Sequence, residues 1–500
     1  MSFTWLKKIA IGAVAFMLLP FFVAGQKHFD FSQPCQQAYR EIIQLKLETG
    51  QRILDAEKKR DPSNLIPVFL ENYIDFFTLF FNEDPAEYKR RKDMLDKRVQ
   101  WMSEGPASSP FYLFTRSVLH FQWAAIEIKF GNNWNAGWEF RRSFLQSKEV
   151  QHEFPGFQPA SMLSGAMQVV AGTIPDGYKW LSSLLGIKGN LREGMQQLEK
   201  FLASSDSWAA VFHDEAVFYY LYLKFYIENK HDEVFTYIRE HALDVQHNRL
   251  YTYLAANLAI NNQQAAYAEQ VMRQRSADAG YLEMPVWDLE MGYVRLCHLE
   301  TDAPAYLDRY VRNFKGRFYI KDALQKMSWS YYLQGDMVRA NAYRQDVLRK
   351  GGTDSDADKQ ALKEAKSGKW PERLLLKARL LCDGGYYGDA LALVQGKGAG
   401  DFSAAEDKCE FWYRMGRIYD GMSRWNEALG AYGSAYQLGR DLREYFAARA
   451  ALQSGYIAER RGDKRQAMVY FDQCLSLKDH DYKNSLDQKA KAGVARCKGE

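Results

Sequence analysis

The sequence has little proline, few cysteines and almost no excess of charge of either sign. Its 500 residues include 13 prolines and 6 cysteines, and the net charge is +4. Proline interrupts regular helices, so its scarcity favours a helical chain over a loop-rich β architecture. Nucleic-acid-binding domains usually carry a larger basic excess on one face. We therefore expect an all-α protein with no nucleic acid among its partners.

The chain also lacks the short motifs that carry catalytic or metal chemistry. No HExxH, GxSxG or SxxK sequence occurs, and the histidines are scattered. The cysteines are widely spaced without a CxxC pair, so we expect buried thiols, at most one or two disulfides, and no zinc site. Asp354, Asp356 and Asp358 alternate as in a calcium loop, but the required glycine and glutamate are missing. We predict no enzyme, no cofactor and no metal, and interpret these acids as a helix start.

The chain begins with an apolar leader. Two lysines precede an uncharged stretch over 9–25, in which Val23 and Gly25 supply small residues just before Gln26. A basic start, a short apolar core and a small-residue exit are typical of a secretory signal peptide. We predict cleavage before Gln26 and export to the periplasm or cell envelope. An uncleaved anchor is the alternative, although the stretch is at the lower limit for crossing a membrane.

Pairs of helices with a recurring pattern of large and small residues fill the C-terminal part of the chain. The clearest pair spans 409–436, with a turn at Gly421–Ser423. Small residues in such a pair let the two helices approach closely, while the large ones fill the space between neighbouring pairs. The first helix carries Trp412, Met415, Gly416 and Tyr419, and the second carries Trp425, Ala428, Tyr432 and Ala435.

These eight positions resemble the tetratricopeptide repeat, a helix–turn–helix unit of about 34 residues. Corresponding patterns occur around 321–347, 371–394 and 448–475, with a polar insert at 351–369. The resemblance implies an all-α, tetratricopeptide-like helical-repeat superhelix, or α-solenoid, whose concave face receives peptides. We divide the chain into a signal peptide (1–25), a degenerate N-terminal helical region (26–170), degenerate helical repeats (171–314), tetratricopeptide-like repeats (315–480) and a polar C-terminal tail (481–500).

The stretch 174–198 and the helix pairs after it also resemble the tetratricopeptide-repeat-39-like and inclusion-body-clearance family, through apolar and glycine placement. That resemblance implies an all-helical adaptor without a catalytic centre. Residues 157–187 are nearly free of charge, which permits contact with a membrane. We favour a buried helix at the centre of the fold instead, and we interpret the apolar run 216–227 in the same way.

The first helix of each repeat indicates where a partner would bind. Residues one position away from the packing stripe share the adjacent helix face, which lines the concave groove in tetratricopeptide arrays. Aromatic rings interleaved with arginines could hold an extended peptide through cation–π and charge-assisted contacts. The predicted groove residues are Trp329, Tyr332, Arg379, Tyr413, Arg417, Asp420, Arg449, Tyr456 and Glu459.

Two functions fit this sequence. The first is an exported, non-catalytic scaffold or adaptor that binds protein or peptide segments in its concave groove. The alternative is an envelope glycan-binding helical-repeat protein of an uptake system, in which some of the 12 tryptophans and 31 tyrosines serve as platforms for sugars. No lipid-anchor cysteine follows the leader, which counts against the second.

Overall fold

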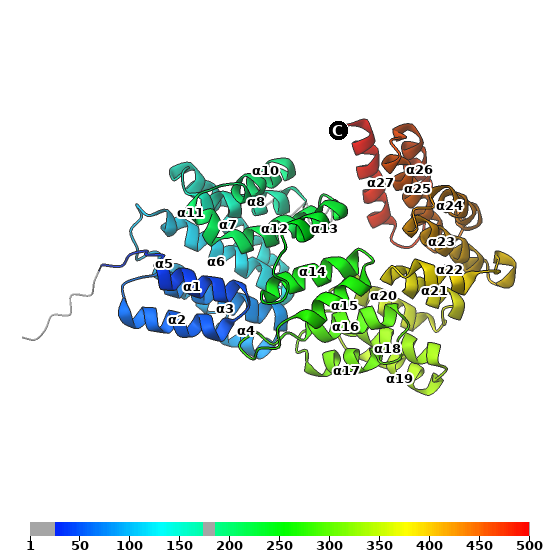
Figure 1. Ribbon diagram of the computed structural model, residues 1–500, viewed down its shortest axis with the longest axis horizontal. Coiled ribbons are helices and arrows are strands. Elements are labelled where there is room, and N and C mark those ends of the chain that lie inside the picture. Colours follow the sequence, from blue (N-terminus) through cyan, green and yellow to red (C-terminus); the bar gives the residue numbers. More distant parts are fainter. Residues whose placement is uncertain (1–25, 174–185, 500) are drawn as a thin grey trace, which may run out of the picture.

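The structure is a computed structural model that describes residues 26–173 and 186–499. Over these residues it is built from α-helices, and an isolated bridge between His28 and Asn64 is the sole β pairing. Successive helices pack against each other as adjacent pairs (Figure 1). The predicted all-α helical-repeat fold is confirmed. The predicted leader lies outside the described residues.

Helices α1–α16 form the part of the molecule that we call the N-terminal body. One continuous hydrophobic core runs through it, from Phe31 to Val294. Its helices are α1 (Gln33–Ile43), α2 (Leu47–Arg60), α3 (Ile66–Asn82), α4 (Pro85–Arg91), α5 (Met94–Met102), α6 (Pro110–Lys129), α7 (Asn133–Glu153), α8 (Gln158–Gly172), α10 (Leu191–Leu202), α11 (Ser207–Val211), α12 (His213–Tyr226), α13 (His231–Glu240), α14 (Arg249–Asn261), α15 (Ala265–Gln274) and α16 (Val286–Cys297).

Contacts between residues far apart in the sequence close this body on itself. The Tyr39 hydroxyl on α1 donates a hydrogen bond to Glu215 on α12. The Phe31 ring meets the ring of Phe212 with centroids 5.6 Å apart. In an open solenoid each repeat contacts only its neighbours, so the N-terminal body departs from that arrangement.

The remaining helices, α17–α27, form what we call the C-terminal array. Its apolar residues fall into several separate small cores, each shared by neighbouring helices. Its helices are α17 (Ala303–Asn313), α18 (Ile320–Gln334), α19 (Met337–Arg349), α20 (Asp356–Ser367), α21 (Arg373–Gly384), α22 (Tyr387–Val394), the short 3-10 turn η2 (Ala399–Asp401), α23 (Ala405–Gly421), α24 (Trp425–Gly439), α25 (Phe446–Arg460), α26 (Lys464–Ser476) and α27 (Lys483–Lys498).

Small residues set the distance between the paired helices of this array. A Cβ atom added at Gly416 would lie 2.3 Å from the Tyr432 ring, and one added at Gly455 would lie 2.4 Å from the Phe471 ring. Both distances are too short for any side chain, so a ring of the next helix occupies the space that a side chain at each glycine would fill. The predicted packing of α23 on α24, through Gly416 and Ala428, is confirmed.

Gly385 joins the C-terminal array to the N-terminal body. Its φ of +83° lies in the left-handed region, which favours glycine, and its Cα faces the carbonyl oxygen of Gln263 so closely that a Cβ atom would clash. The Tyr387 hydroxyl donates to the side chain of the same Gln263 at 3.0 Å. From this junction the array curves back until Lys489 of α27 acts electrostatically on His231 of α13 (Figure 1).

The acidic insert has a structural role that its sequence did not reveal. The acids from Asp354 to Asp358 were interpreted as a helix start, and α20 begins among them. Asp358 is not solvated, however, because it is fully buried and accepts hydrogen bonds from the backbone amides of Tyr319 and Asp322 at 2.8 and 3.1 Å. It therefore caps the start of α18.

The segment 157–187, which is nearly free of charge, is only partly within the described residues. Its first half forms α8, whose side chains are mostly buried and whose Gly165 packs directly against Gly194 of α10. Residues 174–185, which include the start of the stretch compared with the inclusion-body-clearance family, lie outside the described residues. In the described part of the chain, no helix combines the length and apolarity needed to cross a bilayer.

The cysteines and the C-terminal segment complete the fold. None of the six cysteines forms a disulfide, so the structure supports the expected buried thiols and holds no bridge. Burial raises the pKa of the Cys35 thiol to about 11 and that of Cys409 to about 12, which keeps both protonated. Within the segment 481–500, α27 packs on α25 and α26.

Candidate functional site

The nine predicted groove residues lie on the first helices of successive pairs, namely α18, α21, α23 and α25. Two of them do not reach solvent. Trp329 and Tyr413 are each only 2% exposed, so neither ring can receive a peptide, and the prediction that they line an open groove is corrected here. The reason is local: a first helix is covered by its own partner and by the first helices on both sides, which buries the face next to the packing stripe.

Trp329 is held among polar partners from three helices. Its indole N–H donates to Glu364 of α20 at 2.6 Å. The Lys326 ammonium lies 4.3 Å from the ring centroid, and the Arg379 guanidinium lies 4.8 Å from it. The residue therefore joins α18 to α20 and α21, and it positions Arg379.

The Tyr332 ring, half-buried, is also engaged by the protein itself. It stacks on Trp370 with centroids 4.5 Å apart, and its hydroxyl donates to the Pro371 carbonyl oxygen at 3.1 Å. Tyr413 packs between the rings of Tyr432 and Phe446, and the Arg414 guanidinium lies 5.1 Å from its ring centroid. Both tyrosines hold neighbouring helices together.

Two of the three predicted acidic and tyrosine positions nearer the C-terminus are already paired. Asp420 accepts from Arg460 at 3.3 Å, and the two oxygens of Glu459 accept from Arg496 of α27 at 2.8 Å each. The Tyr456 ring meets Phe471 edge-on at 5.7 Å. These residues close the end of the array rather than offering free groups.

The predicted arginines differ from these aromatic and acidic residues because their guanidinium groups are not held by close ion pairs. Arg379 has a single distant ion pair, with Asp383 at 3.7 Å. The guanidinium groups of Arg417 and Arg449 make no hydrogen bond or ion pair with any described residue. Burial alone would lower the pKa of Arg417, but nearby tyrosines and Asp383 outweigh burial and raise it. The Arg417 guanidinium therefore stays fully charged.

Lys489 of α27 completes this group, and sequence reasoning missed it because it lies in the segment assigned as a polar tail. Burial, and then the positive charge of Arg449, lower the pKa of the Lys489 ammonium. Arg379 and Arg449 also both act on Tyr482, opposing the rise of its pKa to about 12 that burial causes. Arg379, Arg417, Arg449 and Lys489 thus share one region, which we call the basic wall.

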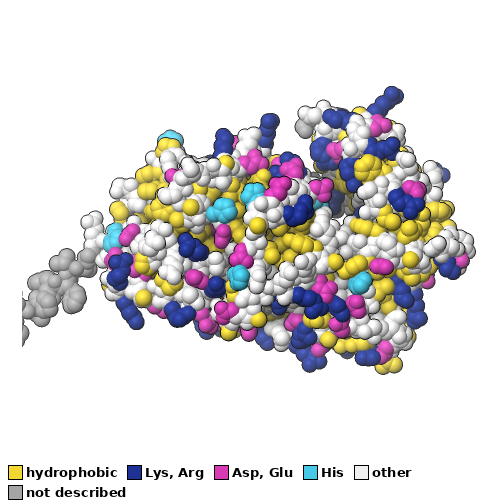
Figure 2. Space-filling view, in the orientation of Figure 1, with side chains coloured by type: hydrophobic (Ala, Val, Ile, Leu, Met, Phe, Trp, Pro, Cys, Tyr) yellow, Lys and Arg dark blue, Asp and Glu magenta, His cyan; other side chains and the backbone are white. Residues whose placement is uncertain are grey.

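Tyrosines lie next to the basic wall, which is on the inner side of the curved array. The Tyr445 ring lies 5.8 Å from the Arg449 guanidinium and 5.3 Å from the Tyr482 ring. Figure 2 shows the molecular surface hollowed between the C-terminal helices and the centre of the molecule. The three arginines are half-buried and Lys489 is exposed. Like charges gathered in one region repel one another, as Arg449 does Lys489, so an anion bound among them would relieve the repulsion.

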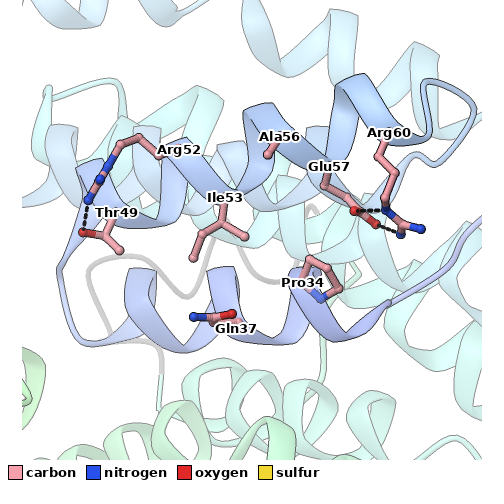
Figure 3. Close-up of a pocket in the computed structure, with 8 residues that line it drawn as sticks. All are labelled: Pro34, Gln37, Thr49, Arg52, Ile53, Ala56, Glu57 and Arg60. Carbon is pink, nitrogen blue, oxygen red and sulfur yellow. Dashed lines mark hydrogen bonds and ion pairs between the residues drawn. The ribbon is translucent and has the colours of Figure 1, made fainter.

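Other polar clusters serve the fold instead. In the hollow of about 480 Å³ between α1 and α2 (Figure 3), Arg60 binds Glu57 and Arg52 donates to the Thr49 hydroxyl at 3.0 Å. His120 contacts Glu139 at 2.6 Å, buried between α6 and α7. Within 26–173 and 186–499, no group of three or more His, Cys, Asp or Glu side chains could hold a metal ion.

Comparisons with known proteins add little to this description. No protein-family model matches the chain, and no curated protein matches it. Among solved structures it is similar to a chain in the crystal structure of the APC/C hetero-tetramer Cut9–Hcn1, at 10% identity. The match covers 93% of this chain and 97% of the other, with a TM-score of 0.25. Because that TM-score is low, the fold is assigned from the packing of this chain's own helices and not from this similarity.

Proposed function

We propose that the protein is an exported, non-catalytic helical-repeat scaffold whose C-terminal array binds extended acidic segments of partner proteins. The observation that carries this proposal is the basic wall, three of whose four cations form no direct ion pair with a described residue, although Asp383 acts on Arg417 from a longer distance. Charge-assisted hydrogen bonds from guanidinium groups to carboxylates are among the strongest that proteins form. An extended segment with acidic side chains would meet this chemistry along the curve of the array.

The rings around the wall support a peptide rather than a sugar as the ligand. A glycan-binding groove needs aromatic faces that are free to stack on the sugar. The four predicted rings, at Trp329, Tyr332, Tyr413 and Tyr456, are all packed against other side chains. These four rings, which were predicted for the peptide groove, therefore offer no free face to a sugar.

Export is the second part of the proposal, and it depends on the leader in residues 1–25. Expression of the full chain in a bacterium, fractionation, and sequencing of the mature N-terminus would test it. Cleavage before Gln26 in an envelope fraction is the expected result. An intact N-terminus in the cytosolic fraction would contradict export without bearing on the basic wall.

Peptide binding can be tested with a defined probe. A fluorescein-labelled peptide of alternating glutamate and alanine should bind the full chain and raise the anisotropy, whereas its lysine counterpart should not. Hydrogen bonds to charged groups contribute roughly 1.5–3 kcal/mol each, so the double variant Arg417→Glu, Arg449→Glu should weaken binding by at least roughly tenfold per reversed charge.

A matched control separates the wall from net charge. Arg465 is exposed on α26, the second helix of its pair, so Arg465→Glu changes the net charge without touching the wall. This variant should bind the acidic peptide within about twofold of wild type at 150 mM salt, where exposed charges are largely screened. Equal binding by wild type and the double variant would refute the proposed groove.

A further inference from the structure

A large apolar cavity lies within the N-terminal body, and none of the basic-wall residues lines it. It has a volume of about 660 Å³, which is within the range of roughly 300–1,000 Å³ that small-molecule sites occupy. Helices α3, α6, α7 and α12 supply most of its lining, and α8 and α14 contribute at the edges. Protein interiors are close-packed with few voids larger than a water molecule, so a space of this size requires an explanation.

One side of the cavity is an aromatic face of α3. Its five rings follow the spacing i, i+3, i+4, i+7 and i+8, which places them on one side of a helix. In a packed core such a face would meet the side chains of a neighbouring helix. Here all five line the cavity: Tyr73, Phe76, Phe77, Phe80 and Phe81.

A face of α12 forms another part of the wall. Glu215, Phe218, Tyr219 and Tyr222 all line the cavity, and seven residues of helix separate the first from the last. At 1.5 Å per residue this face extends for about 10 Å. The cavity is therefore bounded along its length by two ring-bearing helices.

Exposed apolar side chains mark its mouth. Ile128 is 54% exposed, Val170 36% and Tyr222 39%, and all three line the same cavity from three different helices. Single exposed apolar residues are common on protein surfaces, but apolar groups gathered at one opening mark ligand sites.

The inner wall carries one carboxylate that has its own partners. Glu215 is 5% exposed and accepts hydrogen bonds from the hydroxyls of Tyr39 at 2.5 Å, Tyr219 at 2.6 Å and Tyr73 at 3.1 Å. Burial raises the pKa of Glu215, and the three hydroxyls oppose that rise. The group is satisfied without a ligand, and a second anion beside it would be repelled.

No cation in the described part of the chain would balance an anionic group inside the cavity. Its lining contains no lysine, arginine or histidine, and apart from tyrosine hydroxyls its polar side chains are Gln122, Asn133 and Glu215. Lys129, next to the mouth residue Ile128, is held by Glu83 at 2.8 Å and by the Phe80 ring. The few hydrogen-bonding groups also exclude a sugar, which would leave its hydroxyls unpaired.

We propose that this cavity binds one long apolar chain of the alkyl, acyl or isoprenoid class, inserted through the opening at Ile128, Val170 and Tyr222. The inserted end carries no charge, and any polar head group stays at the mouth. The site is separate from the basic wall, so the N-terminal body holds an apolar ligand while the C-terminal array holds an acidic segment.

The direct test is displacement of diphenylhexatriene from the full chain by a series of straight-chain alcohols. Because burial of each methylene contributes roughly 0.8 kcal/mol, affinity should rise roughly fourfold per added carbon until the cavity is filled. Dodecanol should bind at least tenfold more tightly than hexanol. Dodecanoate, whose head is charged, should bind no more tightly than dodecanol.

Two variants locate the binding. Ala125 lines the cavity and is half-buried, so Ala125→Trp should fill it and weaken dodecanol binding at least tenfold. The control Ala56→Trp, at an exposed position on α2 outside this cavity, should bind as wild type does. If Ala125→Trp fails to fold, Val170→Trp narrows the mouth from the surface and should slow and weaken binding.

Several results would overturn the proposal. Absence of displacement at any chain length would mean that the cavity is closed or filled by the protein itself. Affinity that does not depend on chain length, or equal binding by wild type and both cavity variants, would place the probe elsewhere. Tighter binding of a hydrophilic oligosaccharide than of dodecanol would replace the apolar ligand with a glycan. None of these results bears on the acidic peptide, so the two proposals fail independently.

Discussion

The N-terminal body and the C-terminal array are both built from paired helices, but the body contains a large cavity whereas the array forms a curved row of helix pairs. In the array, glycines of one helix receive rings of the next, as Gly416 faces Tyr432. In the body, rings of α3 and of α12 line one cavity, together with rings and small residues of α6 and α7. Rings that are received by glycines close the helix pairs of the array, whereas the rings of the body lie around an unfilled space.

The two regions also differ in how far their cores extend. The body has one core that joins α1 to α12 and continues to α16, while the array has a series of local cores. In an array built from nearest-neighbour contacts, curvature accumulates and presents a concave surface. A closed body can instead shield an interior site from water. The difference assigns the extended ligand to one region and the enclosed ligand to the other.

Enlarging a small residue should distinguish the regions most strongly. Ala450 is fully buried between the array's helices, so Ala450→Phe should lower the free energy of unfolding by roughly 3 kcal/mol, because inserting atoms into a packed core forces its neighbours apart. Ala125→Phe at the cavity should change it by less than about 1 kcal/mol. Urea unfolding measures both, and equal losses would mean that the cavity is no larger than an ordinary packing gap.

The body's buried carboxyls should make its stability depend on pH. Burial raises the pKa of Glu290 to about 8, and a hydrogen bond from Asn257 only partly opposes this. A carboxyl whose pKa is raised in the folded state binds its proton more tightly there, so stability falls as the pH rises from about 5 to 8. The expected loss from this group is roughly 3 kcal/mol.

Glu290→Gln should flatten that pH dependence, and unfolding in urea at pH 5 and pH 8 would show it. The slope is the decisive quantity, because the new amide also changes stability at every pH. Glu283→Gln, at an exposed position shortly before α16, should leave the slope unchanged. A slope that persists in Glu290→Gln would show that another group titrates.

Glycines within the array should respond in opposite directions according to what they face. Gly416→Ala places a Cβ atom against the Tyr432 ring and should destabilise the protein by roughly 1–3 kcal/mol. Gly433→Ala on α24 meets nothing within 4 Å and should stabilise it by about 0.5–1 kcal/mol, since alanine favours helix more than glycine does. The melting temperature should fall in Gly416→Ala and rise in Gly433→Ala. A change of the same sign in both variants would contradict the role of Gly416 in helix packing.

Local patterns made the array predictable from the sequence. The alternation of Gly416, Ala428 and Ala435 with large rings specifies close helix pairs, because both partners lie within one repeat. The groove was only partly predictable: the arginines at 379, 417 and 449 were identified, but the burial of Tyr413 depends on α25 as well as on its own pair. Lys489 reaches the wall only because the array curves, and no local pattern encodes that curve.

The cavity could not be predicted for a related reason. The stripe from Tyr73 to Phe81 has the spacing of an ordinary core-facing helix, and the run 216–227 was interpreted as core on the same basis. Only the positions of α3 and α12 relative to each other show that space remains between them. Glu215 likewise gains its meaning from Tyr39, which is 176 residues away in the sequence.

The central claim is that the two regions bind different ligands independently, and a crossed binding measurement tests it most directly. Wild type, Ala125→Trp and the double variant Arg417→Glu, Arg449→Glu would each be titrated with dodecanol and with the acidic peptide. The account predicts that Ala125→Trp loses only the alcohol and that the double variant loses only the peptide. Loss of both ligands in either correctly folded variant, or of neither in both, would contradict it.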